Sequence, residues 1–201
     1  SDIETLNYRN KRQVSTALSM LRKLHQAKVH SEFDFDVWGK IRKFKEKLLL
    51  TSKADYPEFA QLSAQMETLR QHMERDSSES VLCHCDSYAP NFMVHHGEME
   101  LIDWEYSGNC DPAFDLGVFI CCSEDYSYQD ALEILKIYYQ RELTLSELRH
   151  CFAYIAIASY YWFVWGLYQE SSGKPVGSYL YLWHKYTKQY LEKSLKLYCQ
   201  E

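Results

Sequence analysis

The sequence predicts an α+β fold that is mainly helical, with one small β-hairpin segment near the middle of the chain. Seven segments carry apolar residues at the spacing of an amphipathic or buried helix. Between the third and fourth of these, residues 81–102 contain three short runs of β-forming residues separated by turn signals. The chain has 201 residues, of which 46% are apolar, which is enough to bury one core and predicts a single domain.

The first three predicted helices form a scaffold. They cover residues 10–28, a stretch capped by Asp34 or Asp36, and a stretch opened by Asp55-Tyr56-Pro57. Each presents leucines, aromatics or other apolar residues on one face. His25 and His72 lie on these helices and are predicted to be surface or core histidines, with no role as ligands.

The β segment contains the residues that indicate chemistry. Its runs are residues 81–85, 92–95 and 99–102, with a turn at Gly97-Glu98, and no strand is expected before Val81. Asp86 follows the first run, Asn91 comes five residues later, and Asp103 ends the third run. Phosphoryl transfer from ATP needs one group to orient the attacking hydroxyl and oxygen ligands to hold magnesium on the phosphates. These three side chains supply that set, although carboxylates at strand ends also serve as ordinary turn formers.

Four helices are predicted after the hairpin. The first begins at Asp111-Pro112, and the second covers residues 126–140. A capping box of Thr144 and Glu147 opens a long third helix that reaches about Tyr168, and the last helix ends near Tyr198. A loop at residues 171–175 separates the last two.

The central stretch resembles a known family. The residues that carry the likeness are His84-Cys85-Asp86, Asn91 and Ile102-Asp103-Trp104-Glu105-Tyr106. They are similar to the catalytic loop and metal-binding segment of the choline kinase and aminoglycoside phosphotransferase superfamily, which is protein-kinase-like. Residues 101–116 most resemble the bacterial choline kinases of the phosphocholine-decoration type. Cys85 and Ser87 depart from the pattern, since these families often have Gly or Asn and then Leu there.

The resemblance implies a role for each residue. Asp86 becomes the catalytic residue that orients and deprotonates the acceptor hydroxyl, and Asn91 and Asp103 become ligands of Mg2+ on ATP, the phosphoryl donor. His84 and Asp115 become supports of the catalytic loop, Asp115 through hydrogen bonds to the loop backbone.

The last third of the chain is rich in aromatic residues, which indicates a cation-binding pocket. Thirteen of the 17 tyrosines follow Phe119, together with Trp162, Trp165 and Trp183. Aromatic faces attract quaternary ammonium, although aromatic stripes at helical spacing are more often plain core. By resemblance, Trp162, Trp165 and Tyr181 wall a choline site, and Glu105 either offsets the substrate's charge or has a structural partner.

Several alternatives to choline kinase remain. The same three polar residues serve an aminoglycoside, ethanolamine or thiamine kinase, but no acidic residue lies between Tyr154 and Tyr168, which favours choline over a polycation. A non-catalytic module that binds quaternary amines would not require all three polar residues. An interaction scaffold would expose an apolar surface.

Composition excludes other classes. The net charge of −6 and the lack of a basic cluster argue against nucleic-acid binding. The sequence contains no run of 18 apolar residues that is free of charge, so no membrane span is predicted. Seven cysteines without a secretory signal indicate reduced thiols and a cytoplasmic location. A zinc site is disfavoured because strand alternation separates His84 from Cys83 and Cys85.

The sequence lacks the signals of an ATP-covering lobe. Its seven glycines never form a phosphate-covering loop, and the chain opens on Ser-Asp-Ile-Glu. Residues 1–201 are therefore predicted to be the C-terminal lobe of a longer kinase, with the N-terminal lobe as its missing partner and little activity alone.

Overall fold

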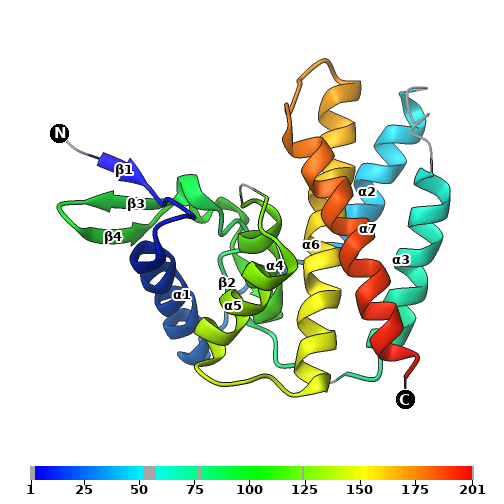
Figure 1. The fold of residues 1–201 in the computed structure, drawn as a ribbon. Helices are drawn as coiled ribbons and strands as arrows, with labels where there is room; N and C mark the ends of the chain where they lie inside the picture. Colours follow the sequence, from blue (N-terminus) through cyan, green and yellow to red (C-terminus); the bar gives the residue numbers. More distant parts are fainter. Residues whose placement is uncertain (1–2, 52–57, 77, 124, 201) are drawn as a thin grey trace.

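The computed structural model describes residues 3–51, 58–76, 78–123 and 125–200, and it places a small β region beside a larger group of helices (Figure 1). The helices are α1 Lys11–Gln26, α2 Val37–Leu50, α3 Phe59–Met73, α4 Pro112–Cys121, α5 Tyr128–Tyr139, α6 Leu145–Ser171 and α7 Tyr179–Tyr198. The strands are β1 Ile3–Thr5, β2 Val81–Cys83, β3 Phe92–His95, β4 Glu98–Leu101 and β5 Gly108–Cys110. Two 3-10 turns, η1 Ala89–Asn91 and η2 Trp104–Tyr106, flank the hairpin. The mainly helical α+β prediction is confirmed.

The predicted hairpin is formed by β3 and β4, which pair antiparallel with Phe92 opposite Leu101. His96 and Gly97 connect them, both at positive φ, as a tight two-residue turn between twisted strands requires. The turn therefore lies one residue earlier than Gly97-Glu98. The shift brings Glu98 into β4 and ends that strand at Leu101, so Asp103 lies beyond the paired region.

Two strands were missed by sequence reasoning. The expectation of no strand before Val81 is wrong, because β1 pairs antiparallel with β3 at the edge of a three-stranded sheet. The run at Val81 does not join the hairpin but pairs with β5 in a second sheet. Both missed strands are three residues long and depend on partners distant in sequence, so they leave no periodic pattern.

Side-chain caps fix the helix starts. Asn10 accepts from the backbone of α1, and Asp36, of the two candidates, caps α2. Thr144 and Glu147 form the predicted capping box of α6, and Ser127 and Asp130 form another on α5. The predicted start of the third helix at residues 55–57 lies outside the described residues.

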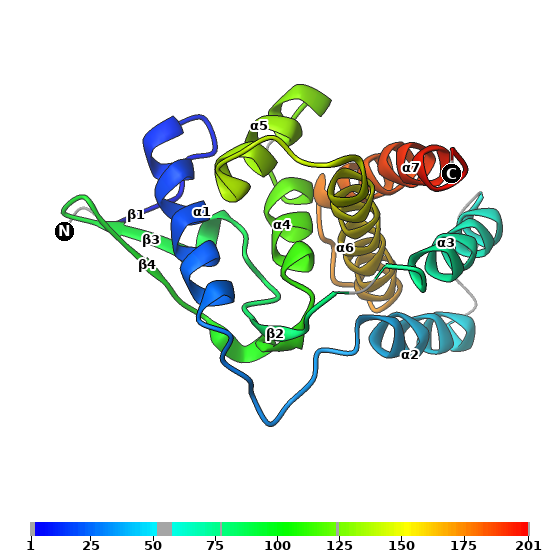
Figure 2. The same ribbon diagram turned by 90° about the horizontal axis from the view of Figure 1, so that it is seen from below.

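Helix α6 is the core of the helical part. It has 27 residues, and α7, α4 and α2 pack around it (Figure 2). It is long and apolar enough to cross a membrane, but 78% of its most apolar window is buried inside the protein. Its lack of a polar face therefore reflects burial among other helices.

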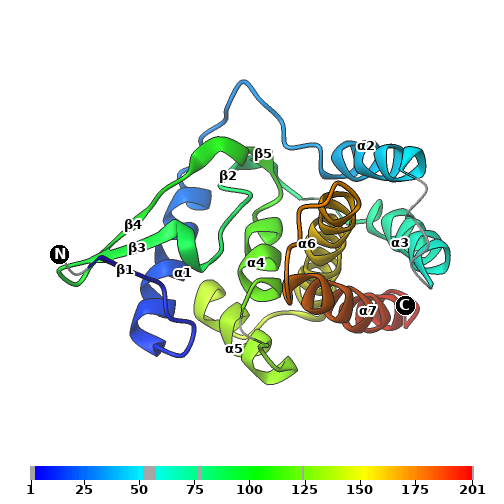
Figure 3. The same cartoon turned by 90° about the horizontal axis from the view of Figure 1, so that it is seen from above.

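Helix α4 lies between α6 and the β region (Figure 3). Gly117 allows the close approach of α4 to α6, because a Cβ there would lie 2.5 Å from the backbone oxygen of Tyr154. This contact fixes the distance between the β segment on one side of α4 and the aromatic helix on the other.

Candidate active site

Asp86 and Asn91 are joined directly. Asp86 is half-buried in the loop after β2, and Asn91 is buried at the end of η1. The Asn91 amide nitrogen donates to the Asp86 backbone oxygen at 2.8 Å and to the carboxylate Oδ2 at 3.0 Å. The donating nitrogen faces Asp86, so the amide oxygen is the atom that Asn91 can offer to a cation.

The end of the hairpin brings Asp103 to the same place. The Ile102 amide donates to the Asn91 backbone oxygen at 2.9 Å, which places residue 103 beside the Asp86–Asn91 pair. Asp103 adopts a left-handed conformation with φ 62°, and the η2 turn follows it. The left-handed conformation costs a bulky or β-branched side chain more free energy than it costs Asp, so a short carboxylate is favoured at this position.

His84 connects the loop to the hairpin. Its ring is fully buried, accepts from the Asp86 amide at Nδ1 and donates from Nε2 to the Ile102 carbonyl at 2.8 Å. These partners assign the neutral ring with its proton on Nε2. His84 is therefore positioned as a support between the loop and the segment that carries Asp103.

Asp115 of α4 holds the loop through hydrogen bonds to its backbone. Its carboxylate is fully buried on α4 and accepts from the His84 amide at 2.9 Å and the Cys85 amide at 2.7 Å. Burial raises the pKa of Asp115, but the hydrogen bond and charge of His25, with the loop amides, bring that pKa below its ordinary value. Asp115 is therefore ionised and can accept all of these bonds.

The electrostatic setting of Asp86 is unusual. Burial, together with the nearby carboxylates of Asp103, Asp115 and Glu105, raises the pKa of Asp86 to about 7 against the hydrogen bond from Asn91. A site with this much uncompensated negative charge favours a cationic ligand, which would lower that pKa again.

Asp86, Asp103 and Glu105 line a cavity of about 420 Å3. The lining residues are Asp86, Tyr88, Asp103, Glu105, Tyr106, Cys122, Trp162, Trp165, Pro175, Val176, Tyr179 and Trp183. Among these described residues, three are carboxylates, six are aromatic and none is cationic. The cavity therefore combines acidic groups with an aromatic wall.

The aromatic wall comes from both long helices. Trp162 and Trp165 of α6 meet edge to face at 5.4 Å, and Trp183 of α7 stacks on Trp162 at 6.0 Å. Tyr179 stacks on Trp183 at 5.3 Å. Gly166 makes room for this arrangement, because a Cβ there would lie 3.1 Å from the Trp183 ring.

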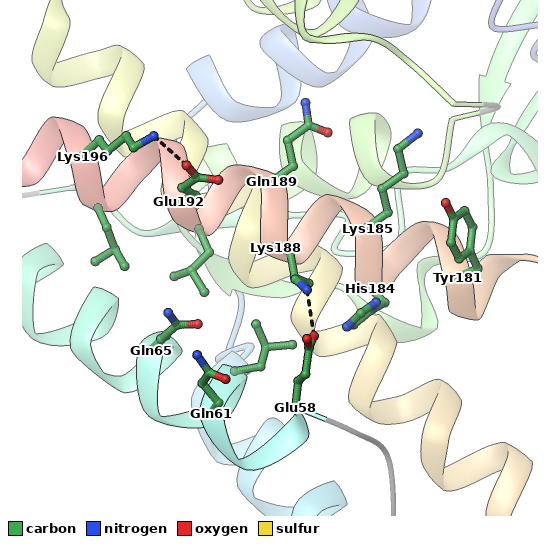
Figure 4. A pocket seen from close by; sticks show the side chains of 13 residues that line it. Glu58, Gln61, Gln65, Tyr181, His184, Lys185, Lys188, Gln189, Glu192 and Lys196 are labelled. Carbon is green, nitrogen blue, oxygen red and sulfur yellow. Dashed lines mark hydrogen bonds and ion pairs between the residues drawn. The ribbon is translucent and has the colours of Figure 1, made fainter.

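Tyr181 does not join this wall. Its side chain is 67% exposed and lies at one end of a different groove, of about 770 Å3, between α3 and α7 (Figure 4). This larger groove is lined mainly by lysine, glutamine and leucine residues and does not contain the Asp86 set. Residues 179, 183 and 181 lie on one helix, but 181 is two positions from each and so faces away from them.

Sequence reasoning missed several residues of the cavity. Tyr179 and Trp183 take the place expected for Tyr181, and Tyr88, Tyr106 and Cys122 complete the lining. Tyr179 and Trp183 are four apart on α7, a spacing that indicates a shared face but not which cavity that face meets.

The donor set fits magnesium chemically. Mg2+ prefers oxygen ligands, and the Asn91 amide oxygen with the Asp103 carboxylate offers such ligands beside the cavity. A hydroxyl in the cavity would find Asp86 as its acceptor of a proton. The arrangement can therefore position an alcohol, a cation and phosphate oxygens around one carboxylate.

The fold defines the class first: it is mainly helical and of protein-kinase-like architecture. Residues 3–156 match the family model described as "Choline/ethanolamine kinase". The chain therefore belongs to the choline/ethanolamine kinase family, whose members are kinase-type phosphotransferases.

Individual relatives agree with the family. Protein LicA of Haemophilus influenzae is 25% identical over 179 residues, covering 83% of this chain and 64% of LicA. Ethanolamine kinase 2 of Rattus norvegicus is 28% identical over 157 residues, covering 67% of this chain and 41% of that protein. The chain thus spans less than two thirds of the length of these relatives.

Solved structures show the same fold. A choline/ethanolamine kinase family protein from Mesorhizobium loti superposes with a TM-score of 0.77 at 22% identity, covering 98% of this chain and 67% of that one. Choline kinase LicA from Streptococcus pneumoniae gives 0.75 at 20% identity, covering 100% and 68%. A LicA structure in complex with AMP gives 0.77 at 20% identity, covering 98% and 67%.

Proposed function

We propose that this chain supplies the acceptor half of a choline kinase, which transfers the γ-phosphoryl group of ATP to the choline hydroxyl. The observation that carries the proposal is the cavity in which Asp86 and an aromatic wall face one space. A quaternary ammonium has no N–H to donate, so aromatic faces suit it better than hydrogen-bond acceptors do. Asp86 lines the same cavity, so a hydroxyl bound there could contact its carboxylate.

In this proposal Asp86 orients the choline hydroxyl and accepts its proton as the oxygen attacks the γ-phosphorus. Positioned general-base help of this kind contributes about 10²–10⁴-fold to the rate. Asn91 and Asp103 would hold magnesium, which, when bound, neutralises charge on the phosphates. His84 and Asp115 keep the loop in place through the hydrogen bonds described above.

The rest of the proposed reaction requires groups that cover the nucleotide. We propose that these belong to an N-terminal lobe, that residues 1–201 are the C-terminal lobe, and that the chain alone turns over slowly. A cytoplasmic location, where ATP and reduced thiols occur together, accords with the proposal.

Ethanolamine is the second candidate acceptor. A primary ammonium donates hydrogen bonds, and Glu105 lines the cavity together with Asp86 and Asp103. The rat ethanolamine kinase relative also favours it. Six aromatic lining residues against three carboxylates support choline first, because the rings add little for an ammonium that hydrogen bonds can satisfy.

The experiment is a calorimetric titration of the chain with choline, ethanolamine and kanamycin, without nucleotide. Choline binding at a Kd at least tenfold below that of ethanolamine is expected. Stronger binding of ethanolamine would make it the acceptor, and binding of kanamycin alone would move the chain to the antibiotic-phosphorylating branch of the superfamily.

Asp86→Asn separates binding from chemistry. In a phosphotransfer assay with the nucleotide-covering lobe present, this variant should lose about 10²–10⁴-fold in kcat with a nearly unchanged choline Kd. Asp76→Asn, remote from the cavity, is the control for a lost carboxylate. Full turnover by Asp86→Asn contradicts the assignment of the base.

A further inference from the structure

We propose that His25 and Tyr138 are positioning residues for the loop that carries Asp86. They act through a buried relay of hydrogen bonds that ends on Asp115. The inference rests on the proposed function in one respect only, because that function makes Asp86 the group to be positioned. The relay itself is a property of the fold and joins three helices to the loop.

The relay has four bonds. Tyr138 on α5 contacts His25 Nδ1 through its hydroxyl at 2.7 Å, and His25 Nε2 on α1 contacts Asp115 Oδ2 at 2.9 Å. Asp115 on α4 then accepts the amides of His84 and Cys85. Tyr138, His25 and Asp115 are each at most 7% exposed, so water competes little for these bonds.

The carboxylate of Asp115 gives the bond from His25 a direction. An ionised carboxylate can only accept, so His25 donates from Nε2 to Asp115. The other ring nitrogen, Nδ1, has the Tyr138 hydroxyl as its hydrogen-bond partner at 2.7 Å. Each group therefore fixes the next, and the ring orientation of His25 decides where the Asp115 carboxylate points.

That orientation matters because the loop is strained. Cys85, the residue before Asp86, has φ 64°, a left-handed conformation that costs a side-chain-bearing residue about 1–2 kcal/mol. Its amide is one of the two that Asp115 accepts, at 2.7 Å. Without a correctly oriented Asp115 carboxylate, the strained conformation at Cys85 loses a stabilising hydrogen bond. The position of Asp86, the next residue, would then be less well fixed.

A metal site is the alternative use of the same residues. Ligand atoms of His25, Cys83 and Asp115 lie within 4.8 Å of one another. However, the Cys83 thiol donates to the Cys110 carbonyl at 3.3 Å, and burial raises its pKa well above the usual range. Both His25 nitrogens and both Asp115 oxygens have partners, so the groups are satisfied as hydrogen-bonding groups.

The test is residue-resolved amide exchange by NMR on the chain, without acceptor or nucleotide. The variants are His25→Leu, which removes both bonds; His25→Gln, whose amide can still donate to Asp115; and Tyr138→Phe, which removes one hydroxyl. Tyr160→Phe is the matched control, since Tyr160 is a buried tyrosine bonded elsewhere, to Ser63. Denaturant unfolding of each variant gives the change in global stability.

His25→Leu should speed exchange of the His84 and Cys85 amides about tenfold beyond the change in global stability, as expected for weakened charge-assisted bonds. His25→Gln should restore them to within about threefold, and Tyr138→Phe should give a smaller increase and shift the His25 Nδ1 resonance. Tyr160→Phe should leave both amides unchanged.

Exchange that follows global stability alone, or His25→Gln behaving like His25→Leu, overturns the proposal. If His25→Leu does not fold, the exchange rates in Tyr138→Phe test the proposal, because this variant removes only one hydroxyl group. No substrate enters these measurements, so the relay can fail while choline binding and transfer stand, and the reverse.

Discussion

The indole of Trp162 on α6 lies face to face with the indole of Trp183 on α7, with 6.0 Å between ring centroids and 27° between ring planes. Trp165 meets both rings edge-on, at 86° to Trp162 and 74° to Trp183. Two helices therefore build the aromatic wall together. A cation at this wall would depend on α7 as much as on α6.

Replacing either stacked indole should weaken choline binding while leaving an apolar side chain in place. Trp162→Leu and Trp183→Leu each remove one ring face, which should raise the choline Kd about 2- to 30-fold, the range of a single cation–π contact. Isothermal titration measures this. Trp38→Leu, on α2 outside the cavity, is the control. Unchanged Kd values in both variants would assign these rings to the core alone.

Tyr179 and Tyr181 should differ sharply although they are neighbours in sequence. Tyr179→Ala removes a ring stacked on Trp183 in the cavity wall and should weaken choline binding about 2- to 10-fold. Tyr181→Ala removes a ring that is 67% exposed in the other groove and should change binding less than twofold. The reverse order of effects would restore Tyr181 as the wall residue.

Cys85 should be more tolerant of Gly than of Ala. Its φ of 64° strains any residue with a Cβ, and Gly relieves this strain while Ala keeps it. Both substitutions lose the buried thiol, so Cys85→Gly should be more stable than Cys85→Ala by about 1 kcal/mol in urea unfolding. Equal stability of the two variants would show that the strain is absent in solution.

His150 should make stability depend on pH. Burial lowers the pKa of His150, but the carboxylates of Asp111, at 2.7 Å, and Asp76, at 3.5 Å, raise it above its ordinary value overall. A raised folded pKa gives stability that is fully present below the unfolded value near pH 6.5 and lost as pH rises through the folded pKa.

The stability difference between the native chain and His150→Gln should therefore be larger at pH 5.5 than at pH 9. A charge-assisted bond of this kind is worth about 1–3 kcal/mol at the lower pH. Urea titrations at both pH values measure it, and the comparison with the variant removes the contribution of other titrating groups. A pH-independent difference contradicts a charged His150.

Cys122 should report occupancy of the cavity. It lines the cavity and is 4% exposed, whereas Cys199 is exposed at the end of α7 and serves as an internal reference. A thiol reagent carrying a trimethylammonium group should label Cys122 faster than an anionic reagent, because three carboxylates line the same space. Choline should slow labelling of Cys122 at least threefold at saturation and leave Cys199 unaffected, as measured by mass spectrometry.

Cys122→Ser identifies the labelled site in that experiment. Burial and the adjacent Cys122 raise the pKa of Cys121, so Cys121 stays protonated and unreactive. Equal labelling by both reagents, or no protection by choline, contradicts a cation-selective cavity at Cys122.

The sequence by itself predicted the helices and the grouping of Asp86, Asn91 and Asp103. Helix starts depend on local hydrogen bonds, as at Asn10 and Thr144. The residues that form each such bond lie within three or four positions of one another, so the sequence alone reveals them. The spacing of Asp86, Asn91 and Asp103 is likewise local, because one short hairpin brings its two ends together.

Only the tertiary structure decided which aromatic residues share the cavity and which residues lie behind Asp115, the residue that bonds to the loop carrying Asp86. Three aromatic residues of α7, Tyr179, Tyr181 and Trp183, are equally good candidates from the sequence. The packing of α7 on α6 at Gly166 determines that Tyr179 and Trp183 line the cavity and that Tyr181 does not. His25 has no local signal, since its partners are 90 and 113 residues away along the chain. Strands β1 and β5 are hidden for the same reason: contacts between distant segments depend on how the whole core packs, which local periodicity does not encode.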